Sequence, residues 1–396
     1  MGIERNLDLK TYEGNVLKGK HDISENRARL LPQINIGAGL NDNFTPPVSV
    51  TDGSAYGKPY NVTKTLQYNS SASIQLQMPL YSQTALTALS ISKTLDHLNT
   101  LSYAKAKEDL IVQISKMYYL AQNTEELRDI TQAFHDNDMA LSVDVKRVSV
   151  NLENLSVQYD NAKAMLTQQY NMLKYIIDYP AEKDIAVEKA DIERTDLAAL
   201  TGLNENLYEL QLLRTQQNLA EQKKKLAKDG YLPTLALTGN WTYTAFTDRF
   251  KNWFQSGESS HWYKSNGIGL SLRIPVFDGF EKRSKIRKAQ VDIDNARLSY
   301  ENALKGMQTQ YANAVNDLAN NQRNFSKQRD NYLLAEDVYK VTSDRYREGI
   351  ASMTEVLQDE MSMSDAQNNY LTAHFNYQVS NLTLLKLTGQ LEKLMK

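Results

Sequence analysis

The sequence contains no cysteine, which excludes disulfide bonds, thiolate metal sites and cysteine nucleophiles. Only 8 prolines occur in its 396 residues, and none lies between Leu80 and Tyr179 or between Val276 and Lys396. Because proline breaks the interior of a helix, proline-free stretches of this length allow unusually long helices.

Several other features are also missing. The net charge is only −2, so no electrostatic footprint for nucleic acid is present. No window approaches the roughly 18 consecutive apolar residues of a membrane-spanning helix, whereas the short, half-apolar strands of a membrane barrel are not excluded. The first six residues lack the apolar segment of a signal peptide, so we expect a cytoplasmic chain or one whose targeting segment has been removed.

No catalytic pattern occurs either. The five histidines are scattered without ligand spacing, and no phosphate-loop, nucleophile-elbow or zinc-protease motif is found. The sequence therefore predicts a protein that is not an enzyme, with no catalytic residues, no metal site and no cofactor.

An internal duplication is the most informative feature present. Three landmarks recur in the same order, namely 28–36 with 227–237, 73–81 with 271–277, and Leu173-Lys174 with Leu385-Lys386. Such similarity at matching positions predicts two copies of one structural unit.

Four segments alternate between apolar and polar residues, which is the period of a β-strand. Their apolar positions are Ile34, Ile36, Ala38 and Leu40; Ala72, Ile74, Leu76, Met78 and Leu80; Leu235, Leu237, Trp241 and Tyr243; and Ile268, Leu270, Leu272 and Ile274. Each segment has roughly the 10 residues that a tilted transmembrane strand needs. Prolines 32 and 233 are expected to enter strands, and prolines 79 and 275 to leave them.

Turn-rich stretches, residues 46–69 and 245–265, separate the paired strands. Aromatic side chains gather in and beside the second stretch: Trp241, Tyr243, Phe246, Trp253, Phe254, Trp262 and Tyr263. In a barrel they would form the membrane-interface girdle, and in a soluble protein they would form a loop-borne cluster. The flanking strands favour the girdle.

Long helices make up the rest of each copy. Ile286, Ala289, Ile293, Ala296, Tyr300, Ala303 and Met307 follow a 3-4 spacing. That spacing is a coiled-coil seam. No strong helix breaker except Gly306 occurs from Gly279 to Arg345, which predicts one helix of about 65 residues.

These patterns predict a mostly α protein with a small β part. The first repeat covers 1–178, with a helix over 4–30, strands over 32–44 and 68–80, and a helical hairpin over 82–178. Residues 179–203 form a linker or equatorial segment. The second repeat covers 204–396, with a helix over 204–229, strands over 232–246 and 265–277, and a hairpin over 279–390.

Four strands cannot close a membrane barrel, because lipid tolerates no unpaired sheet edge. Several chains must therefore contribute strands, eight from two copies or twelve from three. The wider barrel suits a conduit better, since side chains fill an eight-stranded one. This geometry favours an oligomer without selecting the trimer.

The order of motifs resembles the TolC family of outer-membrane efflux proteins over essentially the whole chain. The matching residues are Leu31-Pro32, Leu232-Pro233, Ile274 to Gly279, Arg345 to Ala351 and Glu355 to Leu357. The resemblance implies a homotrimer with a twelve-stranded transmembrane β-barrel on a long α-helical coiled-coil tunnel. It further implies a bacterial outer-membrane location with a periplasmic extension.

The same resemblance implies a function and partners. The chain would be the channel of a tripartite efflux or type I secretion system, giving passive exit to drugs, small molecules or proteins. It would dock to a periplasmic adaptor and an inner-membrane pump, and contact outer-membrane lipid. The alternative is a periplasmic coiled-coil adaptor or scaffold without its own channel, which would explain the helices but not the four strands.

Site residues follow from matching the family's motif. Tyr346 matches the tyrosine of the periplasmic gate, Asp144 its partner and Glu355 a position in an acidic ring. Ala351 stands in place of the gate arginine and Gln358 in place of a second acidic ring, which implies a weaker latch and a less anionic constriction.

The tip of the second hairpin is the expected adaptor contact, through Arg345 and Gly349. The two hairpins are unequal, because Pro79 and Asp144 are 65 residues apart whereas Pro275 and Glu355 are 80 apart. The first hairpin also lacks a tip glycine. It is therefore truncated, or a segment is missing from it.

Overall fold

The computed structural model describes residues 2–52, 54, 57, 59–137, 145–186, 202–250 and 261–391. The chain divides into two compact units. The helical unit comprises residues 1–17, 97–216 and 296–396, and the sheet unit comprises residues 18–96 and 217–295. Each unit takes segments from both repeats, so the sequence repeat and the compact units divide the chain differently.

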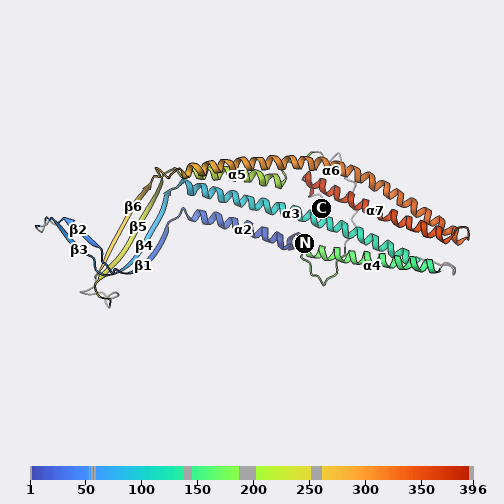
Figure 1. The fold of residues 1–396 in the computed structure, drawn as a ribbon, viewed down its shortest axis with the longest axis horizontal. Coiled ribbons are helices and arrows are strands. Elements are labelled where there is room, and N and C mark those ends of the chain that lie inside the picture. The colour runs from blue at the N-terminus through green and yellow to red at the C-terminus, as the bar shows by residue number, and fades with distance from the viewer. Residues whose placement is uncertain are drawn as a thin grey trace. The chain divides into compact units, whose positions relative to one another are not determined.

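The sheet unit contains a four-stranded antiparallel sheet of order β1-β4-β5-β6 (Figure 1). Its strands are β1 (Gln33–Asp42), β4 (Tyr68–Tyr81), β5 (Thr234–Thr247) and β6 (His261–Arg273). The four alternating segments of the sequence form these four strands. The pairing of β4 with β5, with Ile74 opposite Trp241, joins the two repeats in one sheet.

Two details of the sheet unit differ from the sequence prediction. Strands β2 (Val48–Asp52) and β3 (Tyr60–Lys64) form a separate two-stranded sheet inside the stretch predicted to be rich in turns. Pro79 does not leave its strand but lies within β4, where the register shifts between Pro79 and Tyr81. Such an irregularity accommodates a residue without an N–H donor.

Seven helices are described: α1 (Gly2–Arg5), α2 (Leu7–Ala28), α3 (Gln83–Asn137), α4 (Val145–Ile176), α5 (Tyr208–Asp229), α6 (Glu281–Arg347) and α7 (Met353–Leu387). Helix α6 has 67 residues and continues through Gly306, close to the predicted length. Its seam residues are buried or half-buried, with Ala289 and Met307 buried. Within the described residues, no helix combines the length and apolarity needed to cross a membrane.

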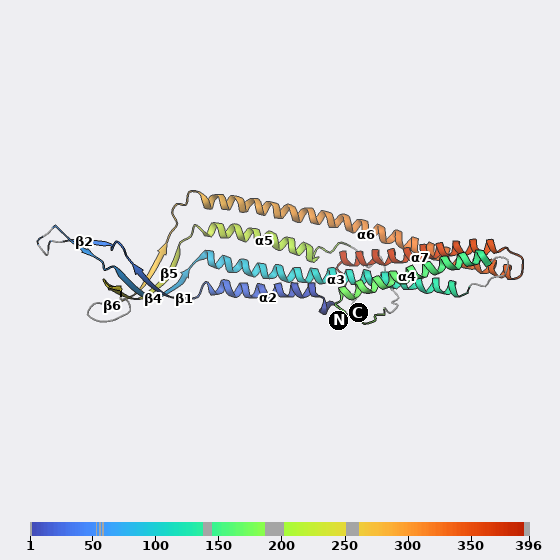
Figure 2. The same cartoon turned by 60° about the horizontal axis from the view of Figure 1, so that its bottom comes forward.

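The core of the helical unit lies where α3, α6 and α7 meet. Tyr119 of α3, Leu318 of α6 and Leu384 of α7 belong to one buried cluster. A second cluster joins Leu9 of α2, Leu110 of α3 and Ile176 of α4. Figures 1 and 2 both show α7 alongside α6, and α4 alongside α3.

The two long hairpins differ in their described lengths. Helix α3 has 55 residues against 67 in α6, whereas α4 has 32 against 35 in α7. Most of the difference predicted from the sequence therefore falls on the first arm. Residues 187–201 of the predicted linker lie outside the described residues.

Candidate gate and sheet surface

The turn between α6 and α7 has a specific helix-ending geometry. Gly349, at φ +75°, donates its N–H to the carbonyl of Tyr346 at 2.9 Å, and the Ile350 N–H donates to the carbonyl of Arg345 at 2.8 Å. This hydrogen-bond pair is the Schellman motif, which places a left-handed residue directly after a helix. Glycine at 349 is required because an L side chain is strained at that φ.

Glu355, the expected acidic ring residue, caps the start of α7. Its carboxylate accepts the Ser352 N–H at 2.7 Å, and the Ser352 hydroxyl accepts the Glu355 N–H at 3.3 Å. The Ser352 N–H, and then its hydroxyl, lower the pKa of this exposed carboxyl, so Glu355 is held ionised. The Ser-x-x-Glu spacing is a capping-box signal that the sequence prediction overlooked.

Tyr346, the expected gate tyrosine, packs at the base of the tip. Its ring is half-buried against Met353 and Val356 of α7 and near Tyr339 of α6. Its hydroxyl oxygen is buried and has no hydrogen-bond partner within the part of the chain that the structure describes. The predicted partner, Asp144, lies outside the described residues.

The predicted adaptor contact is a solvent-facing turn. Arg345 and Gly349 are both exposed, and so is the neighbouring apolar side chain of Ile350. Arg347 forms an ion pair with Asp344 at 3.3 Å on the same helix. The structure thus brings Arg345, Tyr346, Gly349 and Glu355 together in one turn.

The four-stranded sheet has one apolar and one polar face. Residues opposite each other in antiparallel strands point to the same side, so the register defines both faces. The apolar face carries most of the predicted apolar positions, without Leu80 and Ile274, which have no partner in the register, and it also includes Ser70, Lys264 and Asn266. Its apolar residues are Ile34, Ile36, Ala38, Leu40, Ala72, Ile74, Leu76, Met78, Leu235, Leu237, Trp241, Tyr243, Trp262, Ile268, Leu270 and Leu272. Ile36 is 80% exposed and Ile268 is 81% exposed, so the described part of the chain leaves this face open at both edge strands.

The opposite face is polar. Asn35 of β1, Gln75 of β4, Asn240 of β5 and Gly267 of β6 form one row across it, each opposite the next. A soluble sheet buries its apolar face, whereas this one exposes it.

The predicted aromatic girdle falls on both faces. Trp241, Tyr243 and Trp262 lie on the apolar face and are exposed. Phe246 and Tyr263 belong to the other face by the register. Trp253 and Phe254 lie outside the described residues.

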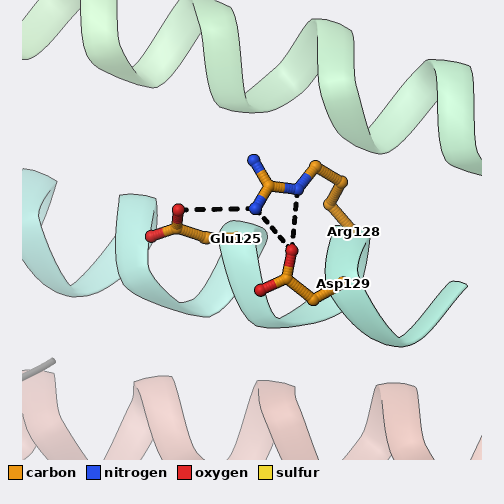
Figure 3. Close-up of polar contacts among 3 residues, drawn as sticks. All are labelled: Glu125, Arg128 and Asp129. Carbon is orange, nitrogen blue, oxygen red and sulfur yellow. Dashed lines mark hydrogen bonds and ion pairs between the residues drawn. The ribbon is translucent and has the colours of Figure 1, made fainter. Parts of the chain in front are cut away.

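Arg128, near the end of α3, forms ion pairs only with side chains of the same helix among the described residues. The Arg128 guanidinium contacts Glu125 at 3.4 Å and Asp129 through two nitrogens (Figure 3). The Asp129 carboxylate raises the pKa of Arg128. Because both carboxylate partners belong to α3, these ion pairs do not latch α3 to another helix.

A second charged cluster does join two helices. Asp109 of α3 binds Lys386 of α7 at 2.6 Å and Lys105 of α3 at 2.9 Å. Burial opposes ionisation of Asp109, but these hydrogen bonds outweigh it and lower its pKa. Lys105 and Lys386 also border a cavity of about 410 Å³ among α3, α6, α7 and the start of α5.

Five stacked rings connect α6 with α7, and the sequence prediction missed them. Phe325 stacks on His374 at 5.0 Å and on Tyr377 at 5.7 Å, while Tyr370 stacks on Phe325 and on Tyr332 at 5.7 Å. The 3–4 spacing of the three rings on α7 was the available signal. No group of three or more metal-binding side chains occurs among the described residues.

Comparison with known proteins finds sequence relatives of this chain among outer membrane proteins. Residues 203–390 match the family model described as outer membrane efflux protein. The chain is 23% identical to Outer membrane protein TolC of Escherichia coli (strain K12), over 94% of this chain and 77% of that protein. It is 25% identical to Outer membrane protein TolC of Vibrio cholerae serotype O1, over 94% of this chain and 85% of that protein.

The fold is also similar to a solved structure, the Campylobacter jejuni CmeC outer membrane channel. The TM-score is 0.72 at 16% identity, with 98% of this chain and 84% of that chain covered. The sequence relatives and the shared fold agree with the motifs, and the chain is similar to outer membrane efflux proteins of the TolC type, with the family match lying in residues 203–390.

Proposed function

We propose that the chain is one subunit of an outer-membrane efflux channel, the passive exit duct of a tripartite pump. The exposed apolar face of the sheet is the observation that carries this function. Its large side chains on the edge strands, such as Ile36 and Ile268, are exposed in the described part of one chain, and its other face is polar. A wall with lipid on one side and water on the other needs this distribution.

Three copies would build the channel. Strands β1 and β6 are the edges of the four-stranded sheet, and lipid tolerates no open edge. Pairing β6 of one copy with β1 of the next removes every edge, and three copies give a barrel of twelve strands. The helices of the three copies then form the periplasmic tunnel, whose tip docks to an adaptor and an inner-membrane pump. The exposed turn at Arg345 and Gly349 supports that role.

The gate is assigned to the tip of the second hairpin. Tyr346 has a buried hydroxyl in need of an acceptor, which Asp144 would supply in the closed channel. Glu355 contributes an ionised carboxylate from each copy, so three would form an anionic ring. Such a ring favours cations over anions in a narrow passage.

The assembly is tested by purifying the full chain. It should require detergent, migrate as a heat-sensitive trimer and form conducting pores in planar bilayers. All three outcomes are expected only if lipid covers the apolar face of the sheet. A monodisperse monomer that stays soluble without detergent would contradict the proposal.

The anionic ring is tested by Glu355→Gln, measured as cation selectivity from reversal potentials. Glutamine keeps the acceptor that the capping box uses, so α7 should still begin correctly. We expect a lower cation preference in this variant. Asp292→Asn, an exposed site on α6 near the sheet, removes the same charge and should leave selectivity unchanged. Equal selectivity in wild type and Glu355→Gln would reject the ring role.

A further inference from the structure

The connection from β6 to α6 exposes apolar side chains to an unusual degree. Val276 is 92% exposed, Phe277 76% and Phe280 62%. The two phenylalanine rings pack edge to face at 5.6 Å, and neither belongs to a buried cluster of the described residues. Exposed aromatics beside an apolar sheet face are typical of the membrane interface.

Basic side chains follow directly. Residues 281–288 contain five basic side chains and one acidic one. Lys282 pairs with Asp278 at 3.0 Å and Lys285 with Glu281 at 2.6 Å. The remaining three, Arg283, Arg287 and Lys288, are exposed, and none has an ion pair within the described residues. They lie away from the half-buried seam residues of α6.

The end of α5 carries a matching group. Lys223, Lys225 and Lys228 are exposed and likewise lack ion pairs in the described part of the chain. The α5 and α6 segments adjoin, because the Lys282 ammonium lies 5.3 Å from the Tyr231 ring and Lys224 hydrogen-bonds Gln290. We call Lys223, Lys225, Lys228, Arg283, Arg287 and Lys288 the basic collar.

The basic collar lies at the sheet-proximal ends of α5 and α6. Arg283 to Lys288 fall within the first eight residues of α6, which span about 12 Å at 1.5 Å per residue. Lys223 to Lys228 fall within the last seven residues of α5, just before β5. The two groups are therefore close to the sheet along the chain, one shortly after β6 ends at Arg273 and the other shortly before β5 begins at Thr234.

We propose that the basic collar, with Val276, Phe277 and Phe280, is a binding surface for anionic phospholipids of the leaflet that faces the helices. The apolar side chains enter the boundary between acyl chains and headgroups, and the unpaired guanidinium and ammonium groups bind headgroup phosphates. The proposal rests on the membrane placement given above. The proposed site adds a preference for anionic lipids, which the net charge of −2 for the whole chain does not indicate.

The test uses the full-length protein, delipidated in a neutral detergent. It is titrated with phosphatidylglycerol or phosphatidylcholine in the same detergent, and bound lipid is counted by native mass spectrometry. The test variant is Arg283→Gln/Arg287→Gln/Lys288→Gln. The matched control, Lys305→Gln/Arg323→Gln/Lys327→Gln, removes three exposed charges from the same helix farther from the sheet.

Wild type and control should bind phosphatidylglycerol more tightly than phosphatidylcholine. In the test variant, the ratio of the two affinities should fall by at least about ten-fold. Phosphatidylcholine binding should not change. An undiminished preference in the test variant, an equal loss in both variants, or full displacement of lipid by millimolar inorganic phosphate would overturn the proposal. Lipid binding is measured in detergent and does not depend on conductance. If the protein fails to conduct in planar bilayers, that result contradicts the proposed channel and not the proposed lipid site.

Discussion

The helical unit and the sheet unit use the same apolar residue types in opposite ways. In the helical unit, Leu210 and Leu384 are 0% exposed, inside clusters shared by several helices. In the sheet unit, Ile36 and Ile268 stand almost fully exposed on a continuous face. The difference shows that apolar periodicity identifies a shared face but does not reveal whether protein or lipid covers it.

The largest effect is expected in the helical core. Leu384→Ala should lower the free energy of unfolding by about 2–5 kcal/mol, because it removes methyl groups from a site that cannot collapse. Thermal or denaturant unfolding in detergent measures this change. Leu298→Ala, at an exposed position of α6, should cost much less. Equal losses would contradict the assignment of the core.

A charged substitution distinguishes the two faces of the sheet. Ile268→Arg should oppose insertion into bilayers by about 2–4 kcal/mol, because the guanidinium would enter the lipid. Ser271→Arg places the same charge on the polar face and should be tolerated. Folding into vesicles, followed by heat-sensitive mobility, compares the two. If both variants insert equally well, the apolar face does not meet lipid.

A smaller effect is expected at the tip turn. Gly349→Ala should destabilise by about 1–2 kcal/mol, since its φ of +75° strains an L residue. Gly306→Ala, inside α6 with open space around its Cβ position, should instead stabilise by about 0.5–1 kcal/mol. Unfolding midpoints of the two variants should therefore move in opposite directions. A shift of both in one direction would contradict the Schellman geometry.

The smallest effect concerns pH. Burial in the ring stack lowers the pKa of His374, and the Glu126 carboxylate on α3 only partly opposes this. Its other neighbours, Phe325 of α6 and Gln378 of α7, carry no charge. Because the unfolded chain takes up the proton more readily, stability should fall as pH drops below about 6.5 and level off below the folded-state pKa.

His374→Phe keeps a ring in the stack and removes the proton site, so its stability should vary less between about pH 5 and 7. His97→Gln, at an exposed histidine, should retain the wild-type slope. The measurement is the thermal midpoint as a function of pH. A slope unchanged by His374→Phe would show that other groups set it.

Much of the local structure could be predicted because its causes are local. Alternation at Ile34 to Leu40 and at Leu235 to Tyr243 identified strands, and the 3-4 spacing from Ile286 to Met307 identified the buried side of α6. The β2–β3 pair was missed because five-residue strands inside a turn-rich stretch give little periodic signal. Glu355 was predicted for its charge, but its contacts with Ser352 emerged only in three dimensions.

The sequence by itself predicted the duplication, determined the strand and helix periods and indicated the resemblance to a family, because these depend on residues in order along the chain. Only the tertiary structure decided which strands pair, as Ile74 does with Trp241, and which apolar side chains stay uncovered. It also decided that the ring of Phe325 stacks on that of His374. Likewise, only the structure shows that Arg283 and Lys228 are exposed without ion pairs within the described residues. The physical reason is that pairing and exposure depend on segments far apart in sequence, whose contacts no local pattern encodes.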